Sequence, residues 1–314
     1  MIALAARGLS KTYGEQPVVD ALDLAVERGE LYGFLGPNGA GKTTTIRMAL
    51  GLVRPSGGEV ELLHAPVFSR DGQRALERVG ALVEEPGFYR FLSGRRNLEV
   101  FARAGGRGEG TDLRLSRLDE VLAMVDLTDA AGKRVRAYSQ GMRQRLGIAA
   151  ALLGKPDVLV LDEPTNGLDP QGMREIRLLL RRLTDEGTTV FVSSHLLAEV
   201  EAMCDRVGVL AHGKLVAEGP PGKLRGSAER VRIEVNDTAH ARIVIEKVDG
   251  VALLDDASPA PGPGALRVRL THSTSAALNR ALVSAGVEVS ALAPERDSLE
   301  DVFLALVEGE DVPR

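Results

Sequence analysis

Residues 36–43 have the sequence Gly-Pro-Asn-Gly-Ala-Gly-Lys-Thr. This is the pattern G-x-x-x-x-G-K-[ST], a glycine-rich loop that holds nucleotide phosphates. The apolar run Leu31–Leu35 before it predicts a buried strand, and Thr44–Leu50 after it predicts a helix that ends at Gly51. Because strand, loop and helix follow in the required order, a chance glycine-rich turn with an exposed lysine is the weaker interpretation.

Each residue type in this loop has a physical role. The glycines allow positive φ and a close approach of the backbone to an anion, while the N–H groups form a nest at the positive end of the helix. Lys42 supplies a point charge for the β- and γ-phosphates, and Thr43 offers a hydroxyl to Mg²⁺. The predicted nucleotide contacts are Gly36, Pro37, Asn38, Gly39, Ala40, Gly41, Lys42, Thr43 and Thr44.

The composition is that of a soluble globular protein, with 44% hydrophobic and 26% charged residues in a chain of 314. A net charge of −5 gives no electrostatic footprint for nucleic acid, so we expect no nucleic-acid partner. The single cysteine, Cys204, excludes a disulfide framework and a cysteine zinc site and fits a reducing cytoplasm. No apolar run approaches the ~18 residues of a membrane span, and residues 1–7 lack the pattern of a signal peptide.

The apolar runs predict an α/β domain over residues 1–218. Helical patterns separate several strand-like runs, which favours a mainly parallel sheet covered by helices, the core of a P-loop ATPase. Between about residues 88 and 155 helical patterns dominate, so we expect a helical insertion there. The expected strands are Leu31–Leu35, Val79–Val83, Val158–Leu161, Val190–Val192 and Arg206–Leu210.

A cluster of chain breakers, Gly219-Pro220-Pro221-Gly222, predicts a boundary, with a linker over residues 219–227. Beyond it, residues 228–314 predict a small α+β domain. Alternating strands are expected at Val231–Val235 and Leu266–Leu270, a loop at Ala257–Gly264, and amphipathic helices at Thr274–Ala285 and Ser298–Val307.

A pair of carboxylates follows the apolar run Val158–Leu161. The carboxyl end of a parallel strand faces the ligand side of the sheet, so Asp162 can hold Mg²⁺ there and Glu163 can polarise an attacking water. Alone, the pair would be an ordinary solvated strand end, but the phosphate loop makes the catalytic interpretation the stronger one.

Further short motifs occur in a fixed order along residues 4–218. They are Tyr13 in Ser-Lys-Thr-Tyr-Gly, the phosphate loop, Tyr138-Ser139-Gln140-Gly141-Met142-Arg143-Gln144-Arg145, the acids Asp162 and Glu163, Gly167-Leu168-Asp169, and His195 in Val-Ser-Ser-His. In this order they resemble the ATP-binding cassette (ABC) family. Each string except the phosphate loop is weak alone, and the ordered set is specific.

The resemblance implies a role for each motif. Tyr13 stacks on the adenine, although stacking tolerates any base and leaves ATP against GTP open. Ser139 and Gly141, at a helix N-terminus, form the signature that binds the γ-phosphate held by another cassette. Asp169, in the loop that follows the two acids, is a further nucleotide contact. Glu163 and His195 are the catalytic residues.

The resemblance also implies the partners and the setting. One chain carries one phosphate loop and one signature, so a second nucleotide-binding subunit is needed; we expect a homodimer, and a different second cassette stays open. A separate integral membrane permease would complete the transporter, with this chain peripheral on the cytoplasmic face of the membrane. ATP and Mg²⁺ are the expected cofactors.

This sequence departs from the usual pattern of the family at two places, Glu84 and the signature, where Ser-Gln-Gly-Met replaces the commoner Ser-Gly-Gly-Gln. Glu84 stands where the family usually has a magnesium-contacting glutamine, and we expect it to be a magnesium ligand; the alternative is that it points to solvent. The signature Ser-Gln-Gly-Met and the tail Leu-Glu-Asp-Val-Phe-Leu at residues 299–304 are similar to those of the drug- and antibiotic-export branch, with its bacitracin- and daunorubicin-resistance exporters. We therefore expect export of a drug, antibiotic or lipid-like substrate.

Several alternatives remain open at this level. The rival function is a soluble cassette ATPase acting on nucleic acid or ribosomes, which the single phosphate loop and acidic balance disfavour. Phe88, Tyr89 and Phe91 fit equally well as permease anchors or as the core of the insertion. The tail fits a regulatory or dimerising module as well as a scaffold, and the substrate is left undefined.

Overall fold

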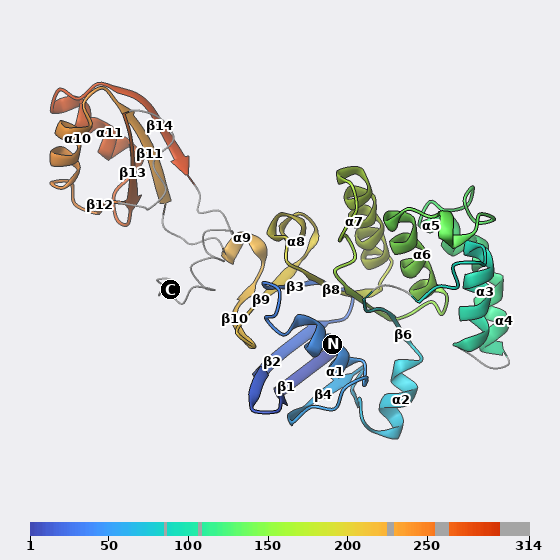
Figure 1. Ribbon diagram of the computed structural model, residues 1–314. Helices are drawn as coiled ribbons and strands as arrows, with labels where there is room; N and C mark the ends of the chain where they lie inside the picture. The colour runs from blue at the N-terminus through green and yellow to red at the C-terminus, as the bar shows by residue number, and fades with distance from the viewer. Residues whose placement is uncertain (85–86, 106–108, 225–228, 255–263, 296–314) are drawn as a thin grey trace. The chain divides into compact units, whose positions relative to one another are not determined.

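The computed structural model describes residues 1–84, 87–105, 109–224, 229–254 and 264–295. Backbone contacts divide the chain into two units, Met1–Pro221 and Gly222–Arg314. Figure 1 shows the elements of both units.

The central sheet of the first unit has six strands in the order β10-β9-β3-β8-β7-β6. Five of them run parallel and β10 is antiparallel at one edge. Their bounds are Leu31–Leu35 (β3), Val79–Leu82 (β6), Val158–Asp162 (β7), Thr189–Ser194 (β8), Arg206–Ala211 (β9) and Lys214–Gly219 (β10). All five strands predicted from the sequence are confirmed, and every residue of β3, β7 and β8 is buried.

Helices cover both faces of this sheet. The helices α7 (Pro170–Asp185) and α8 (Leu197–Met203) pack against β3 and β8 on one face. On the other face, α1 (Lys42–Ala49) lies between β7 and a second sheet, so its buried side chains join the two sheets into one core (Figure 1). The phosphate-loop helix is thereby fixed from both sides.

The second sheet is antiparallel, with strand order β2-β1-β4-β5, and the sequence analysis did not identify it. Its strands are Ile2–Tyr13 (β1), Gln16–Glu27 (β2), Gly57–Leu62 (β4) and Ala65–Pro66 (β5), and the helix α2 (Arg70–Leu76) follows. Register shifts interrupt the pairing of β1 with β2 at four places. Because each shift interrupts the alternation of buried and exposed residues, the period-2 signal is confined to short stretches such as residues 22–27 of β2.

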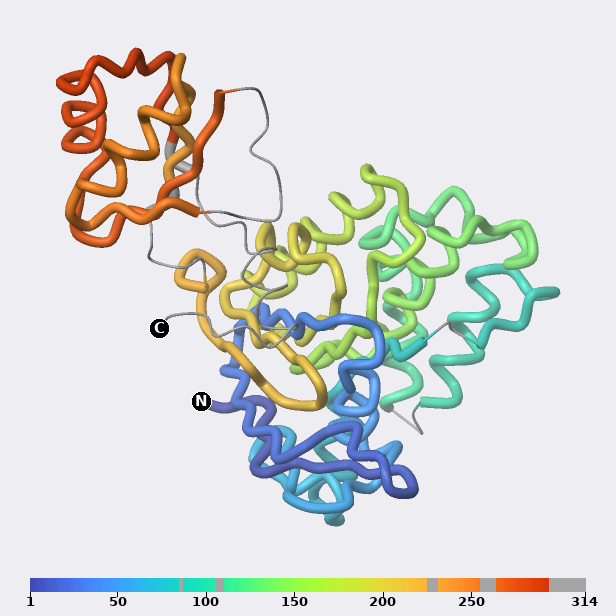
Figure 2. The backbone as a smooth tube through the Cα atoms, turned by 60° about the vertical axis from the view of Figure 1, so that its left-hand side comes forward, coloured from blue at the N-terminus to red at the C-terminus, as the bar shows by residue number. Residues whose placement is uncertain are grey.

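The expected helices between residues 88 and 155 are present. They are α3 (Gly94–Ala104), α4 (Glu109–Ser116), α5 (Leu118–Met124), a 3₁₀ turn (Val135–Ala137) and α6 (Gln140–Leu152). They gather beside the β6 edge of the central sheet in both views (Figures 1 and 2). The helix α6 packs directly on β6, since a Cβ at Gly80 would overlap the carbonyl of Ala151.

The second unit is a four-stranded antiparallel sheet with two helices packed on it. The elements follow as β11 (Glu229–Val235), α10 (Thr238–Ile245), β12 (Val251–Leu253), β13 (Ala265–Leu270), α11 (Ser275–Ser284) and β14 (Val289–Glu295). The strand order β12-β13-β11-β14 gives the split β-α-β arrangement of ferredoxin-like domains. The short helix α9 (Pro221–Leu224) precedes it.

This unit confirms the α+β prediction, with the helix expected at Thr274–Ala285 observed as α11. The helix expected at Ser298–Val307 lies outside the described residues, as does the predicted loop apart from Gly264. The two faces of its sheet differ: Val231, Ile233 and Val268 join an apolar core, and the alternate positions of β11 and β13 carry arginines.

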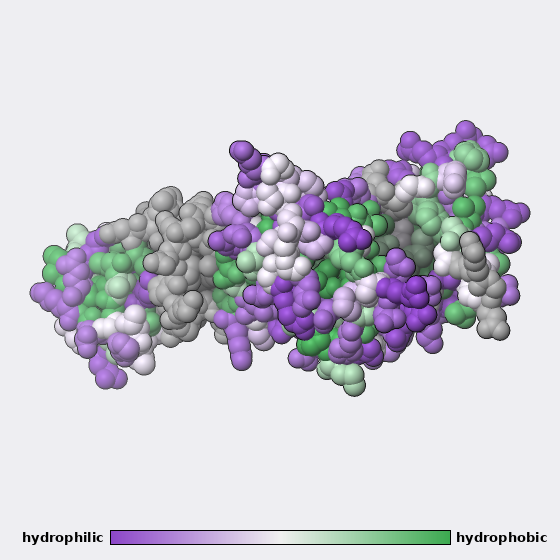
Figure 3. Space-filling view, turned by 90° about the horizontal axis from the view of Figure 1, so that it is seen from below, coloured by the Kyte–Doolittle hydropathy of each residue, from purple (hydrophilic) through white to green (hydrophobic). Residues whose placement is uncertain are grey.

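Hydrophilic residues predominate on the face in Figure 3, with apolar residues scattered between them. None of the helices in the described ranges is long and apolar enough to cross a bilayer.

Candidate functional site

The predicted site residues converge where three neighbouring strands end. In the sheet register Leu35 of β3 pairs with Ser194 of β8, and Asp162 of β7 pairs with Ser193. The phosphate loop, the two acids and His195 follow these positions in the chain, so the topology brings the three motifs together at one sheet edge.

The backbone of the phosphate loop needs glycine at defined positions. Gly39 and Gly41 have φ of 84° and 105°, in the left-handed region that other residues rarely adopt. A Cβ at Gly41 would also lie 2.6 Å from the carbonyl oxygen of Val18. The loop is therefore fixed in shape, and its N–H groups lie at the N-terminus of α1 where an anion is favoured.

Lys42 is buried, with 6% of its side chain exposed, and it is held from two sides. Its Nζ donates hydrogen bonds to the carbonyl oxygens of Gly36 at 2.7 Å and Pro37 at 3.2 Å. It also lies 3.3 Å from Oε1 of Glu163. The cation thus links the phosphate loop to the acid pair on the neighbouring strand.

Asp162 is held by two hydroxyl groups. Thr43 Oγ1 donates to one carboxylate oxygen at 2.8 Å, and Ser193 Oγ donates to the other at 2.5 Å. The Ser193 hydroxyl in turn accepts a hydrogen bond from the backbone N–H of Glu163 at 3.0 Å. The sequence predicted Thr43 and Asp162 as site residues but not Ser193. Its position two residues before His195, near the end of the strand beside Asp162, could have indicated this role.

Glu163 and His195 are in direct contact. His195 Nδ1 lies 2.7 Å from Oε2 of Glu163, a contact in which the ring N–H donates to the carboxylate and Nε2 is left outside the hydrogen bond. Glu163 has a φ of 49°, so its backbone is in the left-handed region. An acid held between a lysine and a histidine has both partners needed to position a water and share its proton.

Glu84 lies at the edge of this cluster. It lines a cavity of about 230 Å³ together with Asp162, Glu163 and Gln144. Its side chain is 62% exposed and forms an ion pair with Arg47 of α1. The exposure of the carboxylate fits the interpretation that Glu84 points to solvent, and its place on the same cavity as the acid pair fits the interpretation that it is a magnesium ligand.

The signature residues and Asp169 begin two helices. Ser139 is the N-cap of α6, its Oγ accepting from the N–H of Met142 at 3.2 Å, and Gly141 packs close to Leu168. Asp169 caps α7 in the same way, accepting from the N–H of Gly172 at 2.9 Å. Each cap stabilises its own helix, and Ser139 is also exposed at the surface of the described structure.

Tyr13 ends β1 with a half-exposed ring. The ammonium of Lys11 lies 5.1 Å from the ring centroid, a cation–π arrangement that presents the ring to solvent. Its exposure leaves room for a base to stack.

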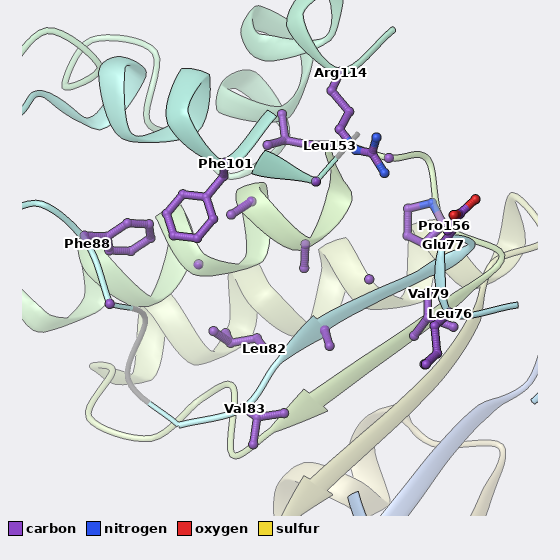
Figure 4. Close-up of a pocket in the computed structure, with 18 of the residues that line it drawn as sticks. Leu76, Glu77, Val79, Leu82, Val83, Phe88, Phe101, Arg114, Leu153 and Pro156 are labelled. Atoms are coloured by element: carbon purple, nitrogen blue, oxygen red, sulfur yellow. The ribbon is translucent and has the colours of Figure 1, made fainter. Parts of the chain in front are cut away.

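A larger cavity, of about 560 Å³, lies between β6 and the helices α3 and α6. Figure 4 shows the rings of Phe88 and Phe101 next to one another at one end, with Arg114 at the other. The two rings meet edge to face at 5.6 Å, while Tyr89 and Phe91 are 49% and 68% exposed. The structure therefore divides the three aromatics: Phe88 packs into the insertion, and the other two are exposed.

Asn97, which sequence analysis missed, fixes this aromatic segment. Its side chain is fully buried and both accepts from the N–H and donates to the carbonyl of Tyr89, at 2.8 and 3.1 Å. A polar residue in an amphipathic helix gives no sign of such a role, because the partner lies in a loop.

Comparison with known proteins agrees with this geometry. The ABC transporter family model matches residues 19–166. The bacitracin transport ATP-binding protein BcrA of Bacillus licheniformis is 40% identical over 306 residues, covering 96% of each chain. The daunorubicin/doxorubicin resistance ATP-binding protein DrrA of Streptomyces peucetius is 36% identical, covering 97% of this chain and 92% of that protein.

Solved structures of ATP-binding cassettes have the same fold as the first unit. An ATP-binding subunit of an ABC transporter aligns with a TM-score of 0.63 and 29% identity, covering 71% of this chain and 91% of that one. A dimeric cassette in a post-hydrolysis state bound to ADP and phosphate aligns with a TM-score of 0.63 and 26% identity, covering 69% and 98%. The chain therefore belongs to the ABC transporter family, as a nucleotide-binding ATPase subunit similar to the bacitracin- and daunorubicin-resistance proteins.

Proposed function

We propose that this chain powers a separate membrane permease that exports a drug, antibiotic or lipid-like compound, from the cytoplasmic face of the membrane. The contact of Lys42, Glu163 and His195 carries the proposal, because it joins a phosphate-binding cation to a water-activating pair. The names of the bacitracin and daunorubicin relatives support the export class.

In this proposal the hydrolytic step uses residues of one edge of the sheet. Glu163 accepts a hydrogen bond from the attacking water and acts as its general base. His195, oriented by the contact of Nδ1 with Glu163, presents Nε2 to the water or the γ-phosphate. Lys42 and the N–H groups of the loop stabilise the charge on the transferred phosphoryl group.

The donor set fits Mg²⁺. Thr43 and Asp162 present a hydroxyl and a carboxylate in contact, both hard oxygen ligands. No group of three or more His, Cys, Asp or Glu that could hold a metal occurs among the described residues. Mg²⁺ commonly uses one or two side chains together with phosphates and waters, so this sparse set suits it, with Glu84 as a further ligand. When bound, the ion would neutralise phosphate charge.

We further propose that the sites are completed by a second copy of the chain. Ser139 and Gly141 would supply the helix N-terminus that binds the γ-phosphate across the interface, with Asp169 beside it. The exposure of Ser139 and the dimeric state of a similar cassette support this arrangement.

The permease would dock at the cavity between β6 and the helical insertion. It has an apolar lining that includes Phe88 and Phe101, and the exposed Tyr89 and Phe91 follow in the chain. Exposed aromatics beside an apolar hollow are typical of interaction sites.

Co-purification from membranes of the producing cell tests the proposal. We expect the tagged chain to bring down an integral membrane protein in a stable ratio, with ATPase activity that the partner stimulates. The Phe91→Ser variant should lose the partner while keeping basal turnover. Recovery of only ribosomes or nucleic acid would instead support the rival function.

A further inference from the structure

We propose that Glu199 is a positioning residue that fixes the relative placement of Glu163 and His195 by holding Thr165. This inference rests on the catalytic roles proposed above for Glu163 and His195. The hydroxyl of Thr165, two residues beyond Glu163, donates a hydrogen bond to Oε2 of Glu199, four residues beyond His195. One contact thereby joins the two loops that carry the catalytic groups.

The contact is buried on both sides. Thr165 and Glu199 are 2% and 6% exposed, so water does not compete for the hydrogen bond. A hydrogen bond to a carboxylate in such surroundings is stronger than one between neutral groups. It constrains the loop that begins at Pro164, directly after the acid.

The loop that carries His195 is held by the same helix. The N–H of Leu196 donates to Ser194 Oγ at 2.9 Å, and the N–H of Glu199 donates to the carbonyl of Leu196 at 3.3 Å. Glu199 therefore belongs to the first turn of α8, which sets where the chain leaves His195.

The helix α8 has no room to follow a displaced loop. A Cβ at Gly33 of β3 would overlap the side chains of Val200 and Cys204, so the helix lies directly on the strand that leads into the phosphate loop. The packing of α8 on the central sheet thus fixes the position of Glu199, and the hydrogen bond to Glu199 in turn fixes Thr165.

The second oxygen of Glu199 indicates that stability alone does not explain this residue. Oε1 is buried and has no hydrogen-bond partner within the described structure. Such an oxygen costs free energy of folding, which an apolar residue of similar size would avoid. A role in the reaction accounts for a carboxylate at this position.

The test compares Thr165→Val, Thr165→Ser and Glu199→Leu in the full chain, with Thr184→Val as a matched control. Thr184 is also buried, and its hydroxyl donates to a carbonyl within α7. We expect Thr165→Val and Glu199→Leu to lower kcat by about tenfold or more with KM for ATP unchanged, since a small misplacement of reacting groups is costly. Thr165→Ser keeps the hydroxyl donor, so its kcat should stay close to that of the unmodified chain. Thr184→Val should alter only thermal stability.

A His195→Ala background separates this inference from the proposed function. If Thr165 acts through the catalytic pair, Thr165→Val should lower kcat much less there than in the unmodified chain. A normal kcat in Thr165→Val, or an equal further loss in the His195→Ala background, would overturn the positioning role. A normal kcat in His195→Ala itself would instead refute the catalytic assignment on which it rests.

Discussion

At the scale of single residues, Glu163 combines three constraints. Lys42 lies 3.3 Å from one of its oxygens, His195 lies 2.7 Å from the other, and its φ is 49°. A residue other than glycine in this conformation costs about 1–3 kcal/mol, which the surrounding contacts must offset. The arrangement favours function over local stability.

Replacing Glu163 with Gln should therefore remove turnover but keep nucleotide binding. The amide retains the volume of the acid but cannot accept a proton, so we expect kcat to fall by about 10²-fold or more. Lys42 keeps its bonds to Gly36 and Pro37, so ATP should still bind and hold a dimer, which gel filtration can detect. Glu120→Gln, which changes a half-exposed carboxylate paired with Arg117 on α5, is the control. Undiminished turnover in Glu163→Gln would place the catalytic base elsewhere.

Glu84 gives a second prediction at this scale. Its carboxylate adds negative charge beside the predicted phosphate site, so Glu84→Gln should strengthen nucleotide binding without Mg²⁺, by roughly threefold to tenfold for a hydrated charge. Binding with Mg²⁺ should change less. Titration with a fluorescent ATP analogue at several Mg²⁺ concentrations measures both. An unchanged dependence on Mg²⁺ would show that Glu84 serves only its ion pair with Arg47.

The sequence predicted residues whose chemistry is local to a motif, such as Lys42, Asp162 and His195, and the structure brings them to one sheet edge. The sequence did not identify Ser193, Asn97 or Glu199, because their partners lie in separate segments, 31 and 34 residues away for Ser193 and Glu199 and in a loop eight residues away for Asn97. Ser193 contacts Asp162, Asn97 contacts Tyr89, and Glu199 contacts Thr165 only after the fold has formed. Supporting residues of this kind have no spacing pattern to recognise.

At the scale of elements, the N-cap residue of α6 has two roles: Ser139 caps the helix, and we propose that it also binds the γ-phosphate held by the second subunit. Ser139→Ala should destabilise the fold by about 1 kcal/mol through loss of the N-cap, whereas Ser139→Asn should keep the cap. Both should lower ATPase turnover if the hydroxyl binds the γ-phosphate of the second subunit. Thermal melting and steady-state turnover separate the two effects. Full activity in the Asn variant would leave Ser139 with the cap alone.

The strands β3, β7 and β8 were predictable because both of their faces are buried. Continuous apolar runs such as Leu31–Leu35 and Val158–Leu161 follow from that environment. The strands β1 and β2 are interrupted by register shifts, so their burial pattern is irregular apart from the alternating stretch at residues 22–27 of β2, a signal that the sequence analysis did not use.

At the scale of the whole molecule, each unit has its own apolar core. A chain cut after residue 227 should therefore fold, unfold cooperatively and bind nucleotide, because the phosphate loop, the acid pair and His195 all belong to the first unit. Calorimetry and ATPase assays check this. Loss of ATP-dependent dimerisation with retained nucleotide binding would make the second unit a dimerising module, and loss of nucleotide binding would contradict the prediction.

Cys204 is the only cysteine of the chain, and its thiol is buried against Gly33 at the end of α8. Burial raises the pKa of this thiol far above its usual range, so almost no reactive thiolate forms in the folded protein near neutral pH. A thiol reagent will react when α8 separates from β3, and its rate of labelling reports how often that contact opens. The unmodified chain thus contains its own probe for the opening of the ATPase core. A cysteine introduced on the surface can be labelled selectively, because Cys204 reacts only when that core opens.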